Sequence, residues 1–331
     1  MNNKGKIWII GLVALSFLTT ILTFVFNKDA PPISALEIPQ STIDFFKKIG
    51  DLDHIKIKFV DSLNTDDYNN NKDFGSKESD FEKIEDDNFI VYYRDSNLEL
   101  ERANKTLQYA NESIYHLSDF FGKYYYAKDA KNRKLSIYLA ISEDDFAEIS
   151  EKVGGSTVDW AAGITFNSFS SDGETICNGI VLNSMVQDGE STDLKKVVFH
   201  EMAHYNHFQC MDLTRTEKIY MDWEVEGIAS YFAKDWNKRI PDNKNINDYS
   251  IMESPENYLD SYWIGYHVFS AFEVNYNSNN FHKLIKESYT KSIIDAIPLV
   301  SGYNVESFDK IWRLHCNRQK GQLSAIKKQI Q

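Results

Sequence analysis

Two histidines separated by three residues, with a glutamate directly after the first, occur in the segment His200-Glu201-Met202-Ala203-His204. The apolar periodicity of residues 194–208 predicts an α-helix around them, with Thr192 as a suitable N-cap. Residues four apart lie on one face of a helix, so both imidazoles can bind one tetrahedral zinc ion at about 2.0 to 2.1 Å. The segment therefore predicts a metal-binding helix that a second part of the chain must meet.

Glu201 follows the first histidine by one position, which places its carboxylate beside the metal. There it can act as a general base, taking a proton from a water that the metal activates and passing it to the leaving amine of a peptide. A five-residue pattern of this kind arises by chance in about one chain in a hundred. The prediction of a catalytic site therefore depends on finding the third ligand.

A catalytic zinc site has three protein ligands and keeps one position open for water. A metzincin would have glycine at position 207 and a ligand histidine at position 210, whereas this chain has His207 and Cys210. Either could still be a ligand, although position 207 falls one turn beyond His204 and would need the helix to break soon after. The better candidate is Glu226, 22 positions after His204 on a second predicted helix, with Glu224 as its neighbouring alternative.

The segment around Glu226 has the pattern Trp-x-x-Glu-Gly-x-Ala-x-Tyr, from Trp223 to Tyr231. This pattern after a His-Glu-x-x-His helix resembles the gluzincin peptidases, particularly the aminopeptidase N-like enzymes and the wider peptidase MA-like group. The resemblance implies that Glu226 is the third ligand of one zinc ion per chain. Gly227 and Ala229 would let two helices pack closely enough for Glu226 to reach both histidines. Candidates to orient the imidazoles are Asp222, Ser230 and Asp235.

A second resemblance to the aminopeptidase-type gluzincins is the segment Tyr262-Trp263-Ile264-Gly265, which is similar to their Tyr-x-x-Gly segment. It implies that the Tyr262 hydroxyl stabilises the oxyanion, a task for which a neutral donor is suited. Tyr266 and His267 on the same predicted helix remain alternatives, as does a packing role for all three.

The loop with which aminopeptidase N-like enzymes hold a free substrate amine, Gly-x-Met-Glu-Asn, is missing. Residues 161–165, Ala-Ala-Gly-Ile-Thr, occupy the comparable place. They could form a sheet edge that binds an extended peptide by strand addition, or an ordinary buried strand. An endopeptidase acting on peptide or protein substrates is therefore the expected activity.

The secondary-structure signals change along the chain, from mixed strands and helices before Thr192 to helices after it. This predicts an α+β protein in which a small mixed sheet with helices precedes a mainly helical half. The resemblance implies a zincin-like arrangement, with zinc in the cleft between the halves. Predicted strands are 55–60, 89–93, 135–140, 162–166 and 179–182, and predicted helices are 98–121, 143–149, 194–208, 224–236, 262–276 and 308–323.

Residues 7–26 form an uncharged apolar run long enough to cross a bilayer, preceded by Lys4 and Lys6. They predict a single-pass membrane anchor with an extracytoplasmic catalytic domain; a cleaved secretory signal is the alternative. The predicted organisation is a tail and anchor at 1–28, a juxtamembrane acidic spacer at 29–88, and a metallopeptidase domain at 89–331. Within that domain, 89–209 is mixed and 210–331 helical.

The net charge is -13, from 49 acidic and 36 basic residues, and this charge disfavours nucleic acid as a partner. The three cysteines, Cys177, Cys210 and Cys316, are too few for a disulfide scaffold. The alternative to an enzyme is a noncatalytic zinc-containing module that binds peptides or surface polymers. Glu201 argues against it, because binding zinc needs no general base.

Overall fold

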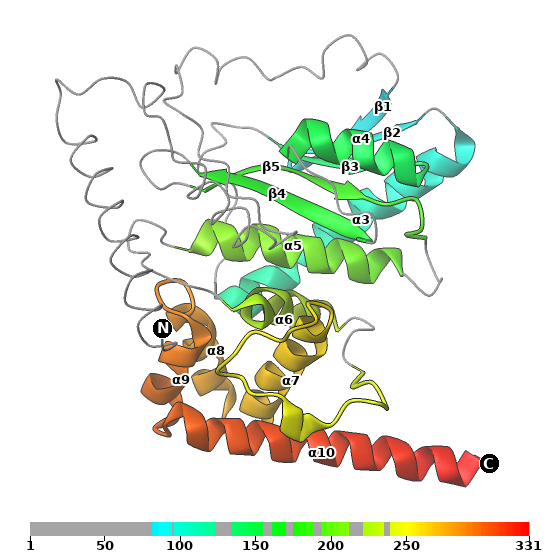
Figure 1. Ribbon diagram of the computed structural model, residues 1–331. Helices are drawn as coiled ribbons and strands as arrows, with labels where there is room; N and C mark the ends of the chain where they lie inside the picture. The colour runs from blue at the N-terminus through cyan, green and yellow to red at the C-terminus, as the bar shows by residue number, and fades with distance from the viewer. Residues whose placement is uncertain are drawn as a thin grey trace, which may run out of the picture. The chain divides into compact units, whose positions relative to one another are not determined.

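A computed structural model describes residues 81–94, 96–122, 134–154, 161–169, 175–187, 193–211, 221–234 and 239–330 (Figure 1). These residues form one five-stranded sheet and eight α-helices, which confirms the α+β class. The strands are β1 (Phe81–Glu85), β2 (Phe89–Arg94), β3 (Leu135–Leu139), β4 (Gly163–Phe169) and β5 (Thr175–Leu182). The helices are α3 (Asn97–Phe121), α4 (Glu143–Gly154), α5 (Leu194–Cys210), α6 (Asp222–Ala233), α7 (Asp260–Asn275), α8 (Ser278–Glu287), α9 (Ile293–Ser301) and α10 (Val305–Ile330).

The sheet is mixed, with the strand order β1-β2-β3-β5-β4. The central strands β2, β3 and β5 are parallel, while β1 and β4 pair antiparallel at the two edges. Strand β1 falls inside the segment 29–88 that the sequence assigns to a spacer, so the sheet begins before residue 89. The predicted strand 55–60 lies outside the described residues.

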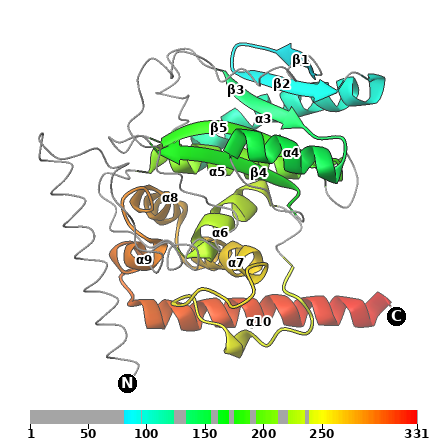
Figure 2. The ribbon, with the colours of Figure 1, turned by 45° about the horizontal axis from the view of Figure 1, so that its top comes forward.

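Helices cover both faces of the sheet (Figures 1 and 2). On one face, Phe146 and Ile149 of α4 pack against Val181 of β5. The opposite face contributes the next residues along the same strand, Ile180 and Leu182, to the main core with α3 and α5. This alternation follows from the two-residue period of a strand. Helix α5 therefore lies between the sheet and the helices that follow it in the sequence.

Helix α5 is buried along nearly its whole length. A helix in this place needs apolar or paired side chains on every face. Its N-cap is Asp193, whose side chain accepts a hydrogen bond of 3.1 Å from the Lys196 backbone N–H. The prediction of Thr192 as the cap was therefore wrong by one residue.

Helices α6 and α7 cross at a contact between two glycines, Gly227 and Gly265. A Cβ atom added to Gly227 would lie 2.4 Å from the Cα of Gly265, so no side chain fits between the backbones. The prediction that Gly227 allows close packing is correct in kind, but it had the wrong partner. Gly227 packs on α7 rather than on α5, the helix that carries His200 and His204. This contact brings the residues that precede Gly227 on α6 close to the start of α7.

The expectation of a single-pass membrane location is contradicted. Across the part of the chain that the structure describes, no helix combines the length and the apolar character needed to cross a bilayer. The apolar run 7–26, on which that expectation was based, lies outside the described residues.

Candidate active site

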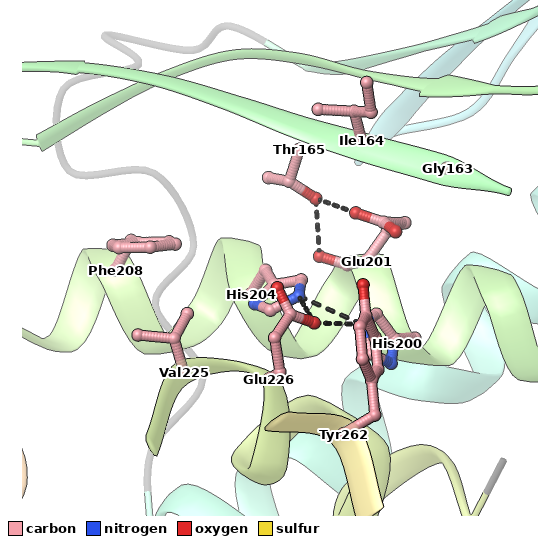
Figure 3. Close-up of a pocket in the computed structure, with 10 residues that line it drawn as sticks. All are labelled: Gly163, Ile164, Thr165, His200, Glu201, His204, Phe208, Val225, Glu226 and Tyr262. Carbon is pink, nitrogen blue, oxygen red and sulfur yellow. Dashed lines mark hydrogen bonds and ion pairs between the residues drawn. The ribbon is translucent and has the colours of Figure 1, made fainter. Parts of the chain in front are cut away.

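Three side chains from two helices meet at one point, His200 and His204 of α5 and Glu226 of α6 (Figure 3). The two Nε2 atoms are 3.0 Å apart, and Oε2 of Glu226 lies 3.3 Å from that of His200 and 3.5 Å from that of His204. All three residues are buried. The structure thus brings together the three residues that the sequence proposed as metal ligands.

The triangle formed by these three atoms fits a tetrahedral metal ion. Bonds of about 2.0 to 2.1 Å place the ligand atoms of such an ion about 3.3 to 3.4 Å apart, close to the three observed separations. Two imidazole nitrogens and one carboxylate oxygen are a donor set that zinc accepts at catalytic sites. The geometry and the chemistry of the cluster therefore both suit zinc.

The carboxyl group of Glu226 is held in its ionised form. Burial alone would raise its pKa, but the charges and hydrogen bonds of His204 and His200 outweigh burial and hold the pKa well below its usual value. An ionised carboxylate is the form that binds a cation.

The alternative ligands lie elsewhere. His207 is buried next to Phe121, with its Nε2 atom 3.4 Å from the hydroxyl of Ser288. Cys210 has its sulfur 3.8 Å from the side-chain nitrogen of Asn206 and forms no disulfide. Glu224 accepts a hydrogen bond of 3.2 Å from the backbone N–H of Ile294 in α9.

Glu201 points away from the α6 side of α5 and toward strand β4 (Figure 3). The Thr165 hydroxyl lies 2.7 Å from Oε2 of Glu201 and 3.0 Å from its backbone oxygen. A Cβ atom added to Gly163 would lie 2.9 Å from Oε1 of the same carboxylate. Strand β4 therefore holds the Glu201 carboxylate, and a side chain at position 163 would force this carboxylate to move.

A cavity that is open to solvent lies between the edge strand β4 and the three clustered side chains. Phe208 and Val225 form an apolar wall next to His204 (Figure 3). The cavity is lined by Gly163, Ile164, Thr165, His200, Glu201, His204, Phe208, Val225, Glu226 and Tyr262 (Figure 3).

Tyr262 is the one of the three oxyanion candidates that lines this cavity. Its ring stacks beside that of His200, with centroids 5.8 Å apart and planes 22° apart. Tyr266, one turn further along α7, packs instead against Tyr231, with ring centroids 5.3 Å apart. His267 faces α10, with its ring 5.5 Å from that of His315.

Tyr258, which sequence analysis did not single out, donates a hydrogen bond of 2.5 Å to Oε1 of Glu226. Burial, followed by the charge of Glu226, raises the pKa of Tyr258 well above its usual value, so the hydroxyl keeps its proton. Tyr258 lies just before α7 and one turn from Tyr262. The helical spacing of α7 does not point to Tyr258, because this residue precedes the helix.

The proposed partners of the imidazoles are placed as follows. Asp222 begins α6, and burial, followed by the charge of Glu226, raises its pKa. Ser230 is buried on the same helix. Asp235 lies outside the described residues.

No protein-family model matches this chain, and neither does any curated protein. Among solved structures, the chain is distantly similar to a two-domain M1 zinc metallopeptidase mutant bound to L-arginine, with 12% identity, a TM-score of 0.40, and coverage of 71% of this chain and 51% of that one. An M1 zinc metallopeptidase from Deinococcus radiodurans matches at 12% identity over 71% of this chain. Its complex with a Tyr-Ser-Ala substrate gives a TM-score of 0.35 and 51% coverage, and a second structure gives 0.34 and 50%. This chain spans about half the length of each.

Proposed function

We propose that this protein is a zinc metallopeptidase of the gluzincin type that cleaves peptide bonds within a chain. The observation that carries the proposal is the spacing of the His200, His204 and Glu226 ligand atoms, which suits a tetrahedral metal ion. Glu201 lines the same open cavity as these three side chains. In this proposal the site occupies the cleft between the sheet half and the helical half, which is the zincin-like arrangement.

Glu201 is the general base of the proposed reaction. Zinc bound by the three side chains would supply a Lewis acid that lowers the pKa of water and polarises the peptide carbonyl. The Glu201 carboxylate accepts the proton of the attacking water and then donates it to the leaving amine. Thr165 fixes one carboxylate oxygen through its hydrogen bond to Oε2, which leaves Oε1 for proton transfer.

Strand β4 suits the binding of an extended peptide. Among the described strands it lies at the edge of the sheet: one side of its backbone pairs with β5, and no other described strand pairs with its second side. A peptide that added to this edge would lie over the cavity, because Gly163, Ile164 and Thr165 of β4 line it. The chain also lacks the segment that binds a free amine in aminopeptidase N-like enzymes. The strand edge over the cavity and this missing segment are the two features from which we infer an endopeptidase.

The proposal is tested by metal removal on the full-length protein. We expect one zinc ion per chain by elemental analysis, and hydrolysis of a library of quenched fluorescent peptides. A chelator should abolish the hydrolysis, and added zinc should restore it. Stoichiometric zinc without hydrolysis of any peptide would favour the noncatalytic binding module instead.

Tyr262 has the position required for an oxyanion donor, and its role gives a second test. Replacing it by phenylalanine keeps the ring beside His200 but removes the hydroxyl. We expect kcat to fall by about 10² to 10³-fold, with KM and zinc content nearly unchanged, because the hydrogen bond would form mainly in the transition state. Tyr266→Phe, one turn along the same helix, is the matched control and should keep wild-type kcat. Equal kcat values in both variants would exclude Tyr262 as the donor.

A further inference from the structure

We propose that Tyr258 is a positioning residue that fixes how Glu226 binds the metal. By holding Oε1 of the carboxylate, its hydroxyl leaves Oε2 alone to face the ion. This inference rests on the proposed zinc site, and it names a residue outside the predicted ligands, base and oxyanion donor.

The two oxygens of the Glu226 carboxylate have different partners. Oε2 faces the two imidazoles at 3.3 and 3.5 Å, while Oε1 accepts the hydrogen bond from Tyr258. Glu226 is only 3% exposed, so water has little access to replace a lost partner. The hydroxyl of Tyr258 therefore determines the orientation of this carboxylate.

The orientation matters because a carboxylate can bind a metal through one oxygen or through both. If Glu226 used both oxygens, they would occupy two positions on the ion, and one of those is needed for water or substrate. A hydrogen bond to Oε1 competes with its binding to the metal and so favours the one-oxygen mode. Partners of this kind typically change metal affinity by about 10 to 100-fold.

Tyr258 is itself held in place by the turn that starts α7. Its backbone oxygen accepts a hydrogen bond of 2.9 Å from the Ser261 N–H, and its ring meets that of Tyr262 edge-on, with centroids 5.9 Å apart. The contact of Gly227 with Gly265 fixes this end of α7 against the helix that carries Glu226. Two tyrosines of one segment thus have separate tasks: Tyr258 contacts the ligand, and Tyr262 lines the cavity.

The experiment compares zinc affinity in full-length wild type, Tyr258→Phe and Tyr262→Phe, each stripped of metal and titrated against a chromophoric chelator. We expect the Kd for zinc to rise by about 10 to 100-fold in Tyr258→Phe and to stay at the wild-type value in Tyr262→Phe. With Co²⁺ in place of zinc, Tyr258→Phe should show weaker visible absorption than wild type, because a fifth ligand atom reduces the intensity of tetrahedral Co²⁺ bands.

Wild-type zinc affinity in Tyr258→Phe would overturn the inference and leave the proposed enzyme intact, provided that wild type binds zinc and cleaves peptides. A wild-type protein that binds no zinc would remove both proposals. The thermal unfolding midpoint of the metal-free variants shows whether Tyr258 acts on metal binding or on the stability of the fold. A marked drop for metal-free Tyr258→Phe alone would assign the tyrosine to folding and also overturn the inference.

Discussion

Replacing Glu201 by glutamine is expected to lower kcat/KM for peptide hydrolysis by about 10³ to 10⁴-fold, the upper part of the range for general acid–base groups. The expected loss is large because, in the proposed mechanism, this one carboxylate both accepts and returns the proton. An amide of the same size can still accept the Thr165 hydrogen bond, so the structure around it should persist. Zinc content should stay at one per chain, because Glu201 is not among the three clustered residues that are proposed to bind the metal.

The matched control is Glu148→Gln, which changes a surface glutamate paired with Lys152 one turn along α4. Exposed pairs of this kind contribute at most about 1 kcal/mol, so activity and stability should hardly change. Full activity in Glu201→Gln would refute the general-base role. Loss of zinc together with activity would instead show that Glu201 supports the metal.

The histidine pair could be predicted from the sequence because the pattern that marks it lies within five consecutive residues. Four-residue spacing fixes the shared face of His200 and His204 for any straight helix. The proposed placement of Glu226 needed a pattern in a second helix, since spacing alone did not separate it from Glu224. The hydrogen bonds of Thr165 and Tyr258 join residues 36 and 32 positions apart in sequence, and no local signal specifies such pairs.

The same distinction explains the fold. Long periodic segments such as α3 and α5 were predicted within about two residues of their bounds. Strand β1 was missed because its sequence, Phe-Glu-Lys-Ile-Glu, is mostly charged and lies at a sheet edge. Helices α8 and α9 are short, and α9 contains Pro298, which weakens a helical pattern. Strand order and the partner of Gly227 depend on packing between distant segments, which periodicity does not encode.

Replacing Gly265 by alanine is the other change for which we expect a large effect, this time on stability. A Cβ atom there would lie 2.1 Å from the backbone oxygen of Trp223 and 2.4 Å from the Cα of Gly227. Both are backbone atoms, so the clash cannot be relieved by turning a side chain. Alanine favours a helix interior over glycine by about 1 kcal/mol, and overpacking typically costs about 1 to 3 kcal/mol. A backbone clash this close should cost at least as much as the upper end of the overpacking range. The cost of overpacking should therefore exceed the stability that alanine adds to the helix.

We therefore expect Gly265→Ala to lower the free energy of unfolding of the metal-free protein by about 2 kcal/mol or more, measured by urea denaturation. Any variant that folds must separate α6 from α7, which moves Glu226 away from Tyr258 and should weaken zinc binding as well. Gly321→Ala in α10 is the matched control: nothing lies within 4 Å of the added Cβ, so it should stabilise the helix by up to about 1 kcal/mol. Equal stability of Gly265→Ala and wild type would mean that the two helices can part without loss, and that their glycine contact does not set the position of Glu226.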